Sequence, residues 1–532
     1  MIAAADIGAL SSTTIESLYV IRGELSADAV TKSLQGLLPT RHQRILKRRL
    51  TLLDTFDGRV RRTGSRLTRS GVGETVTISW QRRGGASLTV QVREPVSFVW
   101  DLPDGPLREA VAPVIGVRRL FPQVETETFG SRLDVLDERN KTIARLRIES
   151  GRARLPGSGC AWQMLPSMIT LSGLRGYAEA HNELVPVIES RPGVEACPEG
   201  FDGVTLRQLG ALPAVVSSPG TDLLPTVLAN VGARSIHLGL LQILMANEPG
   251  LRDNLDTEFL HDFRVAVRRT RSLLGQIKGV FPRNTAEHFS HEFSWLGRLT
   301  APARDVDVLV LSLGVQREEI PPHLMEALTA FLGQAQQHEH KKLVKVLDGD
   351  RYRRLVSDWA TFLKQATPLH VGAPNAGRRL ADVVTQRAWR LSQRILRSIE
   401  TIDEHTPAER LHEVRLTAKK LRYLVDVTPA LYDAADHQRI LSALKKLQRA
   451  LGDFNDAQVQ EQRLLEYGRA VAAAGGPQGT VLALGELAER CRQRRDDLRR
   501  QVADGLAKFR ARNTRSACRR AFKRTAPADS AP

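Results

Sequence analysis

The sequence predicts an α+β chain of two domains, an antiparallel β-sheet domain followed by an all-helical domain. Three observations lead to this prediction. The spacing of apolar residues changes from a period of 2 to a period of 3.6 near residue 225. A basic segment of twelve residues occurs twice in the second part, at an offset of 151 residues (411 − 260). The chain has 532 residues, of which 42% are hydrophobic, so it is long enough and apolar enough for at least two cores.

The first part of the chain is predicted to form short strands. Segments rich in β-branched residues, mostly alternating apolar with polar side chains, lie at 75–80, 87–92, 97–100, 132–136 and 142–148. Residues 26–37 and 105–114 are predicted as short helices. The run Ser217-Ser218-Pro219-Gly220 predicts a domain boundary within residues 213–225. The first domain is therefore assigned to residues 1–215.

The second part of the chain has helical periodicity up to residue 512. Short turns, many with Pro, Gly or Asn, separate helices predicted at 225–247, 256–281, 284–299, 303–314, 321–347, 351–366, 375–400, 407–432, 436–451, 455–474 and 479–512. The second domain is assigned to residues 225–512. Residues 513–532 hold five basic residues and one acid, and they are predicted to be a basic disordered tail.

The repeated segment places one histidine and four cations in the same register. Residues 260–271 read L-H-D-F-R-V-A-V-R-R-T-R, and residues 411–422 read L-H-E-V-R-L-T-A-K-K-L-R. The second segment follows T-P-A-E, in which Thr406 is the predicted helix N-cap. On a helix, positions i, i+3, i+7 and i+10 fall within roughly 80° of one another. This spacing forms two stripes, one of His261, Arg264, Arg268 and Arg271, the other of His412, Arg415, Lys419 and Arg422.

These stripes differ from an ordinary solvated helix face. Such a face usually carries both acidic and basic residues, because oppositely charged i,i+4 pairs stabilise the helix. Each segment contains a single acid, Asp262 or Glu413. The pattern therefore favours a two-fold site for a large anion. The alternatives are a solvated charged face and, for the histidines, a place in the core. A further basic helix has the same spacing, with Arg387, Arg390, Arg394 and Arg397.

The repeat extends beyond the basic segments. Residues 304–308 read R-D-V-D-V and residues 455–459 read N-D-A-Q-V, which matches Asp305 to Asp456. Each aspartate is predicted to cap a helix or to orient a basic side chain through an ion pair. A catalytic role would require a partner base that the sequence does not identify.

Charge and cysteine content narrow the function classes. The net charge is +18, and residues 226–512 contribute +10 of it (44 basic residues minus 34 acidic). A strongly basic domain implies a polyanion, a nucleic acid or an anionic membrane surface as its partner. The four cysteines form no C-x-x-C pair, and there is no run of 18 apolar residues. We therefore expect a cytoplasmic protein without a structural zinc site and without a membrane partner.

The paired basic segments, each followed by a helix and then by R-D-V-D-V-L or L-G-D-F-N-D-A, resemble the CHAD domain, the conserved histidine α-helical domain. The resemblance covers about residues 225–512. It implies two four-helix bundles related by pseudo-two-fold symmetry, a basic channel that binds inorganic polyphosphate, and association with polyphosphate granules. It further implies that the ligand meets His261, Arg264, Arg268, Arg269, Arg271, His412, Arg415, Lys419, Lys420 and Arg422, and less specifically Arg390, Arg394 and Arg397.

The first domain is similar to the CYTH domain, a triphosphate-tunnel β-barrel. Residues 54–67 read D-T-F-D-G-R-V-R-R-T-G-S-R-L, which resembles that family's D-T-x-D-x-x-L-x-x-x-G-x-x-L segment. The resemblance implies an antiparallel β-barrel. Catalytic members open with E-x-E-x-K, whereas residues 16–24 read E-S-L-Y-V-I-R-G-E. Arg145 and Arg147 stand in the place of late acidic residues, where they would repel a metal ion. We therefore expect a degenerate barrel without catalytic residues, metal or cofactor.

The predicted function is thus binding of inorganic polyphosphate. One alternative is a metal-dependent triphosphate hydrolase of the CYTH type in residues 1–210. The other is a nucleic-acid-binding protein. Aromatic residues make up only 5% of the chain and do not alternate with the cations, so RNA or DNA is expected to bind through charge alone at low salt. A metal site at His261 and His412 is disfavoured because their neighbours are cations. The sequence identifies no protein partner.

Overall fold

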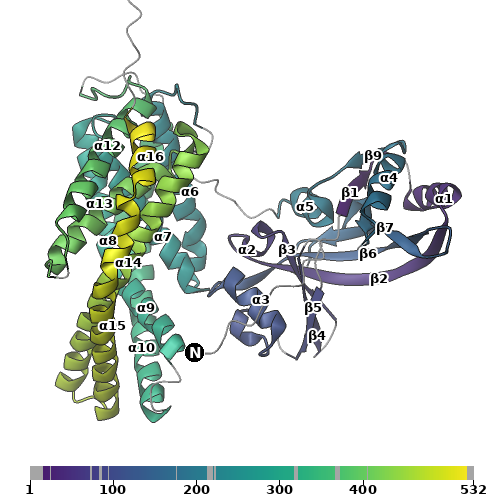
Figure 1. The fold of residues 1–532 in the computed structure, drawn as a ribbon. Coiled ribbons are helices and arrows are strands. Elements are labelled where there is room, and N and C mark those ends of the chain that lie inside the picture. Colours follow the sequence, from purple (N-terminus) through teal and green to yellow (C-terminus); the bar gives the residue numbers. More distant parts are fainter. Residues whose placement is uncertain are drawn as a thin grey trace, which may run out of the picture. The chain divides into compact units, whose positions relative to one another are not determined.

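The computed structural model describes residues 16–523 except 24–25, 72–74, 83–86, 94, 158, 175, 212–219, 221–222, 317–321, 366–371 and 404. The chain divides into two compact units, Met1–Val215 and Val216–Pro532. In the described residues, the first unit contains one β-sheet with helices, and the regular elements of the second are helices (Figure 1). The predicted two-part α+β architecture is confirmed.

The first unit is built on a nine-stranded antiparallel sheet with the strand order β5-β4-β3-β2-β6-β7-β8-β1-β9. The strands are β1 (Glu16–Ile21), β2 (Thr40–Thr55), β3 (Ser65–Ser70), β4 (Val76–Arg82), β5 (Ser87–Val92), β6 (Leu120–Leu136), β7 (Thr142–Arg154), β8 (Gln163–Gly173) and β9 (Val194–Ala196). The helices of this unit are α1 (Ala27–Leu37), α2 (Arg59–Arg62), α3 (Pro106–Ile115), α4 (Ala178–Glu189) and α5 (Gly200–Gln208).

The sheet is not closed into a barrel, so this part of the prediction is wrong. Closure would require the free edge of β1 to pair with β5. That edge pairs instead with β9, where Tyr19, Val20 and Ile21 lie opposite Ala196, Glu195 and Val194. In the described part of the chain β5 pairs only with β4. A strand has two edges, and those of β1 pair with β8 and β9, so neither edge is available to β5.

Helices cover both faces of β1, because its successive side chains point in opposite directions. Tyr19 and Ile21 belong to the core that α1 and α4 complete. Val20 points to the other face, where it packs with Met168 and with Phe201 of α5. This second face would be the interior of the predicted barrel, and α5 occupies part of it.

Strands in which apolar and polar side chains alternate were predicted well, and segments without this alternation were not. The strands predicted at 75–80 and 87–92 correspond to β4 and β5, and both short helices are present as α1 and α3. The strand predicted at 97–100 is wrong, because Val99–Asp101 form a 3₁₀ turn whose N-terminal N–H groups donate to the Asp101 carboxylate. β2 was missed because its first half is exposed and rich in arginine, which removes the apolar alternation.

The second unit contains the helices α6 (Ala229–Arg252), α7 (Thr257–Gln276), α8 (Arg283–Leu299), α9 (Ala301–Gln316), α10 (Pro322–Leu347), α11 (Asp350–Lys364), α12 (Leu380–Glu400), α13 (Ala408–Asp426), α14 (Ala434–Ala473), α15 (Gln478–Arg510) and α16 (Arg512–Phe522). One group of packed helices consists of α6, α7, α8 and α11, and another of α12, α13, α14 and α16. The long helices α14 and α15 run side by side (Figure 1).

The internal repeat is present in the structure as well as in the sequence. Helices α6, α7 and α8 begin at residues 229, 257 and 283, and α12, α13 and α14 begin 151 residues later, at 380, 408 and 434. The two copies exchange reciprocal hydrogen bonds. The Ala229 N–H donates to the Arg378 carbonyl (2.8 Å), and the Leu380 N–H donates to the Val227 carbonyl (2.9 Å). Because 227 and 378 also differ by 151, these bonds relate equivalent positions of the two copies.

The two copies differ at one helix break. α8 ends at Leu299 and α9 begins at Ala301, whereas α14 runs without interruption through the equivalent positions. The break predicted between residues 451 and 455 is therefore wrong. Pro302 explains the difference, since proline lacks a backbone N–H and its ring clashes with the carbonyl four residues earlier. The equivalent residue 151 positions later is Asp453, which can continue a helix.

The prediction of a disordered tail is wrong for residues 513–522. These residues belong to α16, which contacts α12, α14 and α15. Ala517, Cys518 and Phe522 are buried there. Their spacing is that of a single helix face, which the five cations of residues 513–532 obscured in the sequence. The rest of the predicted tail, residues 524–532, lies outside the part of the chain that the structure describes.

Candidate polyanion-binding site

The two repeated segments lie on α7 and α13, and these helices contact each other. Phe263 and Val267 of α7 are buried, as are Val414 and Leu421 of α13. The basic stripes lie beside these apolar faces. His261, Arg264, Arg268, Arg415, Lys419 and Arg422 are partly buried, and Arg271 and His412 are exposed. The amphipathic arrangement brings cations to the boundary between the two helices.

Arg264 binds the end of α8. Its Nη1 donates to the Gly297 carbonyl (2.9 Å) and to the Thr300 hydroxyl oxygen (2.6 Å). The last carbonyls of a helix lack donors within the helix, so a guanidinium that reaches them satisfies groups left open by the break before α9. The side chain of Arg264 is thereby fixed in one orientation.

Replacing Arg264 with alanine is expected to lower the free energy of unfolding by about 2 kcal/mol, because the buried Thr300 and the end of α8 lose a charged donor. Denaturant unfolding of the full chain would measure this. Arg271→Ala is the matched control, since it removes an exposed cation from the same helix. Equal effects of the two substitutions would contradict the role given to Arg264.

In the second copy the equivalent arginine has a different partner. Arg415 donates from Nη2 to Oδ1 of Asp456 (2.9 Å), which lies on the uninterrupted α14. The prediction that Asp456 orients a basic side chain is confirmed by this bond. Its counterpart Asp305 lies 3.4 Å from Nη2 of Arg463, also on α14, and burial raises the pKa of Asp305. The two aspartates therefore hold different arginines.

Cations from the two stripes lie close enough to repel one another. Burial lowers the pKa of Lys419 to about 8. The surrounding charges that also act on Lys419 are Arg415, Arg268, Asp456 and Arg422, of which only Asp456 favours the charged form. Burial likewise lowers the pKa of Arg264 to about 10, and Arg268 is among the cations beside it. Arg268 belongs to the first copy and Lys419 to the second, so the stripes form one cluster.

Two residues outside the predicted set belong to this cluster. Arg268 donates from Nε to the Tyr423 hydroxyl oxygen (2.7 Å). Asp426 accepts from Nη2 of Arg269 (3.3 Å) and from Nε of Arg422 (3.2 Å). Asp426 follows Arg422 by four residues, a spacing that could have indicated the pair. No sequence signal pointed to Tyr423, because the equivalent residue of the first copy is Ser272.

Comparison with known proteins decides the family of this unit. Residues 236–465 match the family model of the CHAD domain. These residues form a CHAD domain. The resemblance that the paired basic segments indicated is thereby confirmed, and the duplicated helices α7 and α13 lie inside the matched range.

Similar proteins add little about function. Two curated proteins of Mycobacterium tuberculosis, the uncharacterized proteins MT2285 and Rv2226, are 26% identical over 329 residues, which is 59% of this chain. The chain spans 60% of the length of these relatives. Among solved structures, the CHAD domain from the plant Ricinus communis is 26% identical (TM-score 0.46) and covers 54% of this chain and 95% of its own. PptA from Streptomyces chartreusis is 16% identical (TM-score 0.40), with 53% and 100% covered.

The basic helix α12 adds cations beside the end of α7. Arg387 donates from Nε (2.9 Å) and Nη2 (2.7 Å) to Oε1 of Gln276, the last residue of α7. Burial lowers the pKa of Arg387, and Arg390 and Arg394 lower it further. Arg390, Arg394 and Arg397 are exposed, as is Lys420 on α13. The CHAD domain thus has buried, positioned cations and exposed ones on neighbouring helices.

His412 lies at the exposed surface of α13, next to α14. Its Nδ1 lies 2.7 Å from Oδ1 of Asn455. No group of three or more His, Cys, Asp or Glu side chains suited to a metal ion occurs in the part of the chain that the structure describes. The described helices also include none that is long and apolar enough to cross a bilayer.

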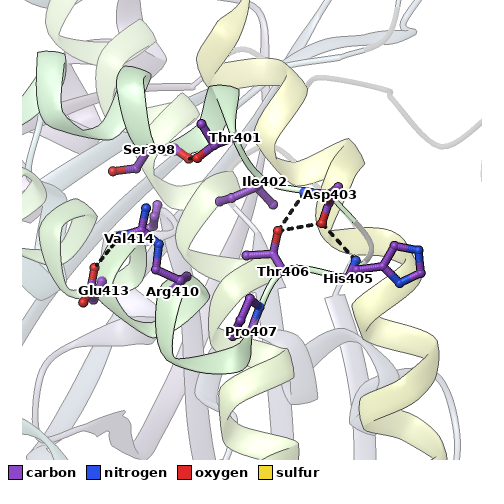
Figure 2. Close-up of a pocket in the computed structure, with 10 residues that line it drawn as sticks. All are labelled: Ser398, Thr401, Ile402, Asp403, His405, Thr406, Pro407, Arg410, Glu413 and Val414. Atoms are coloured by element: carbon purple, nitrogen blue, oxygen red, sulfur yellow. Dashed lines mark hydrogen bonds and ion pairs between the residues drawn. The ribbon is translucent and has the colours of Figure 1, made fainter.

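A cavity of about 310 Å³ lies between the end of α12 and the start of α13 (Figure 2). Its lining includes Thr406, whose hydroxyl donates to Asp403 (2.8 Å) and accepts from the Asp403 N–H (2.9 Å). The prediction of Thr406 as N-cap is therefore wrong, and α13 begins at Ala408. None of the predicted site residues lines this cavity. The cavity belongs to the turn between α12 and α13, and it is separate from the cation cluster.

Proposed function

We propose that the CHAD domain binds inorganic polyphosphate through the cations of α7, α13 and α12. The proposed contacts are His261, Arg264, Arg268, Arg269, Arg271, His412, Arg415, Lys419, Lys420, Arg422, Arg390, Arg394 and Arg397. The observation that carries the proposal is the position of Arg268 beside Lys419, which joins the stripes of both copies into one cluster. Polyphosphate bears a negative charge on each internal phosphate, so a chain lying along the cluster would relieve the repulsion among its cations.

Some buried donors of the cluster have no acceptor among the described residues. Nε of Arg269, Nε of Arg415 and Nε2 of Gln448 are buried, and they have no acceptor among the described residues. Buried donors without acceptors cost free energy, and native proteins contain few of them. Arginine also forms paired bonds with phosphate oxygens, for which its planar group is suited.

We also propose that the CHAD domain consists of two four-helix bundles related by pseudo-two-fold symmetry, α6–α7–α8–α11 and α12–α13–α14–α16. The reciprocal hydrogen bonds at Ala229 and Leu380 support this arrangement. It suits a long, linear ligand, because two equivalent stripes can engage successive segments of one chain.

Nucleic acid is the main alternative ligand, and the aromatic residues speak against it. Single-stranded nucleic acids are held by bases that stack on exposed aromatic rings. Phe263 is fully buried, Tyr423 is 5% exposed, and the Tyr423 hydroxyl already accepts from Arg268. Neither ring offers a stacking surface beside the stripes, so RNA would compete only through charge.

For Met1–Val215 we propose a CYTH-like domain without catalytic activity. The alternative, a metal-dependent triphosphate hydrolase, needs metal carboxylates and a lysine on the first strand. Glu16, Leu18 and Val20 alternate along β1 and share one of its faces, on which Val20 packs against α5. On β7, Nε of Arg145 lies 3.5 Å from Oδ1 of Asp134, and Nη2 of Arg147 lies 2.8 Å from Oε1 of Glu149. These carboxylates are therefore paired with arginines. Metal-dependent release of phosphate from triphosphate by the full chain would contradict this proposal.

The binding proposal is tested by titrating the full chain with long-chain polyphosphate near physiological salt, with RNA and triphosphate as competitors. Lys419→Gln is expected to weaken binding about tenfold, because it removes a central charge. Arg283→Gln is the matched control. It removes a cation 14 residues before Gly297 on α8, about 21 Å away along the helix, and should leave affinity unchanged. Equal competition by RNA, or equal effects of both substitutions, would reduce the cluster to a general basic surface.

We further propose that polyphosphate binding directs the protein to polyphosphate granules in the cytoplasm. Fluorescently tagged protein should coincide with the granules, and Lys419→Gln combined with Arg422→Gln should disperse it while Arg283→Gln does not. Granule association that survives the double substitution would place the targeting signal elsewhere in the chain.

A further inference from the structure

Tyr423 and Asp426 hold three arginines of the cluster, and they do so from one helix. Tyr423 accepts from Nε of Arg268 (2.7 Å), and its ring centroid lies 6.0 Å from the guanidinium carbon of Arg268 and 5.8 Å from that of Arg269. Asp426 lies 3.3 Å from Nη2 of Arg269 and 3.2 Å from Nε of Arg422. Arg268 and Arg269 belong to α7, and Arg422 belongs to α13. The pair therefore ties both copies of the repeat together.

These contacts exist in only one copy. The residues 151 positions before Tyr423 and Asp426 are Ser272 and Gly275, which carry neither a phenol nor a carboxylate. The two-fold symmetry of the helices is thus broken at the point where α7 and α13 meet.

Burial makes the Asp426 contacts stronger than those of a surface ion pair. The side chain of Asp426 is 15% exposed and that of Arg269 is 22% exposed. Asp456, another carboxylate beside the cluster, is 63% exposed and pairs with Arg415. Solvent screens exposed ion pairs, so Asp456 orients its partner weakly and Asp426 orients its partners firmly.

We propose that Tyr423 and Asp426 are positioning residues of the polyanion site, which fix Arg268, Arg269 and Arg422 in the orientation that binds the ligand. The proposal rests on the proposed function of the CHAD domain. An arginine loses considerable side-chain entropy when it is immobilised. Side chains already held in place before binding do not lose that entropy on meeting the ligand, so affinity rises even though Asp426 itself repels an anion.

The test compares two substitutions that each remove one negative charge, Asp426→Asn and Asp456→Asn. Charge alone predicts that both strengthen polyphosphate binding. Positioning predicts that Asp426→Asn weakens it about tenfold, the scale of one charge-assisted hydrogen bond, while Asp456→Asn does not. Asp426→Glu should restore part of the affinity, and Tyr423→Phe, which changes no charge, should weaken binding. Asp426→Asn should also make affinity less steeply dependent on salt, which a loss of stability alone would not do.

A ligand-free measurement separates this inference from the proposed function. In wild-type protein, NMR signals of the Nε–Hε groups of Arg268 and Arg422 should be sharp, and Asp426→Asn should broaden that of Arg422. Signals that are equally sharp in both proteins overturn the inference, whether or not polyphosphate binds. Tight wild-type binding that Asp426→Asn strengthens as much as Asp456→Asn also overturns it. If Asp426→Asn does not fold, unchanged affinity in folded Tyr423→Phe overturns the role of Tyr423. Absence of wild-type binding rejects the proposed function alone.

Discussion

Raising the salt concentration from 50 to 200 mM is expected to weaken polyphosphate binding about 10³-fold. A polyanion releases condensed counterions when cations neutralise its phosphates, so the logarithm of affinity falls in proportion to the number of neutralised phosphates. Several cations of the proposed site have no salt-bridge partner within the described part of the chain: Arg271, Lys419, Lys420, Arg390, Arg394 and Arg397. If the ligand engages all of these cations, the logarithm of the binding constant falls against the logarithm of the salt concentration with a slope of about −5.

Titrations of the full chain at several salt concentrations would measure the slope. Lys420→Gln should reduce its magnitude by about 1, since one exposed cation is removed. Arg283→Gln should leave the slope unchanged, because Arg283 lies at the far end of α8. A slope between 0 and about −2 would mean that the ligand meets only one or two cations, which contradicts a ligand lying along both stripes.

The sequence predicted the cation cluster because its main features are local. Whether His261, Arg264, Arg268 and Arg271 share a helix face depends only on helical geometry. The offset of 151 residues also proved to be a structural equivalence, since the reciprocal bonds of Ala229 and Leu380 follow it. Periodicity and repetition can therefore reveal which side chains share a face, and that two such faces are related.

The contacts that orient these side chains could not be predicted, because they depend on tertiary structure. Arg264 binds the end of α8 only because Pro302 ends that helix, whereas Arg415 meets an uninterrupted helix and binds Asp456. Two arginines that the sequence treats as equivalent thus have different environments. The same applies to Tyr423, whose hydroxyl meets Arg268 across 155 residues of sequence.

Sheet closure was mispredicted for a related reason. The barrel was inferred from the CYTH resemblance of residues 54–67, yet the edge of β1 is occupied by β9, a strand of three residues, Val194–Ala196. A segment that short carries no periodicity that a sequence pattern could detect. α16 was missed because its cations outnumber the apolar residues that bury one face.

Raising the pH from 8 to 9.5 at constant salt is expected to weaken polyphosphate binding progressively, by at most about tenfold per pH unit for one proton. Burial, together with the neighbouring cations Arg415, Arg268 and Arg422, lowers the pKa of Lys419 to about 8, and Asp456 opposes this shift. The free domain therefore loses the Lys419 proton above pH 8. A bound polyanion favours the charged form, so binding above pH 8 must take up a proton.

The stability of the free domain should change in the opposite direction. Between pH 8 and about 10.4, where an unfolded lysine titrates, the unfolded chain holds a proton that folded Lys419 has released. The contribution of Lys419 to the free energy of unfolding therefore increases with pH across this window, and it is constant below it. Weaker binding above pH 8 consequently cannot be attributed to unfolding caused by Lys419.

Calorimetric titrations in buffers of different ionisation enthalpy would count the protons taken up at pH 8.5. Lys419→Arg is the matched variant, because the equivalent residue of the first copy is Arg268 and arginine keeps its charge to higher pH. It should bind polyphosphate as tightly as the wild-type domain at pH 7.5 and lose much of the pH dependence. Proton uptake that is unchanged in Lys419→Arg would show that another group titrates, and the central position given to Lys419 in the cluster would then be wrong.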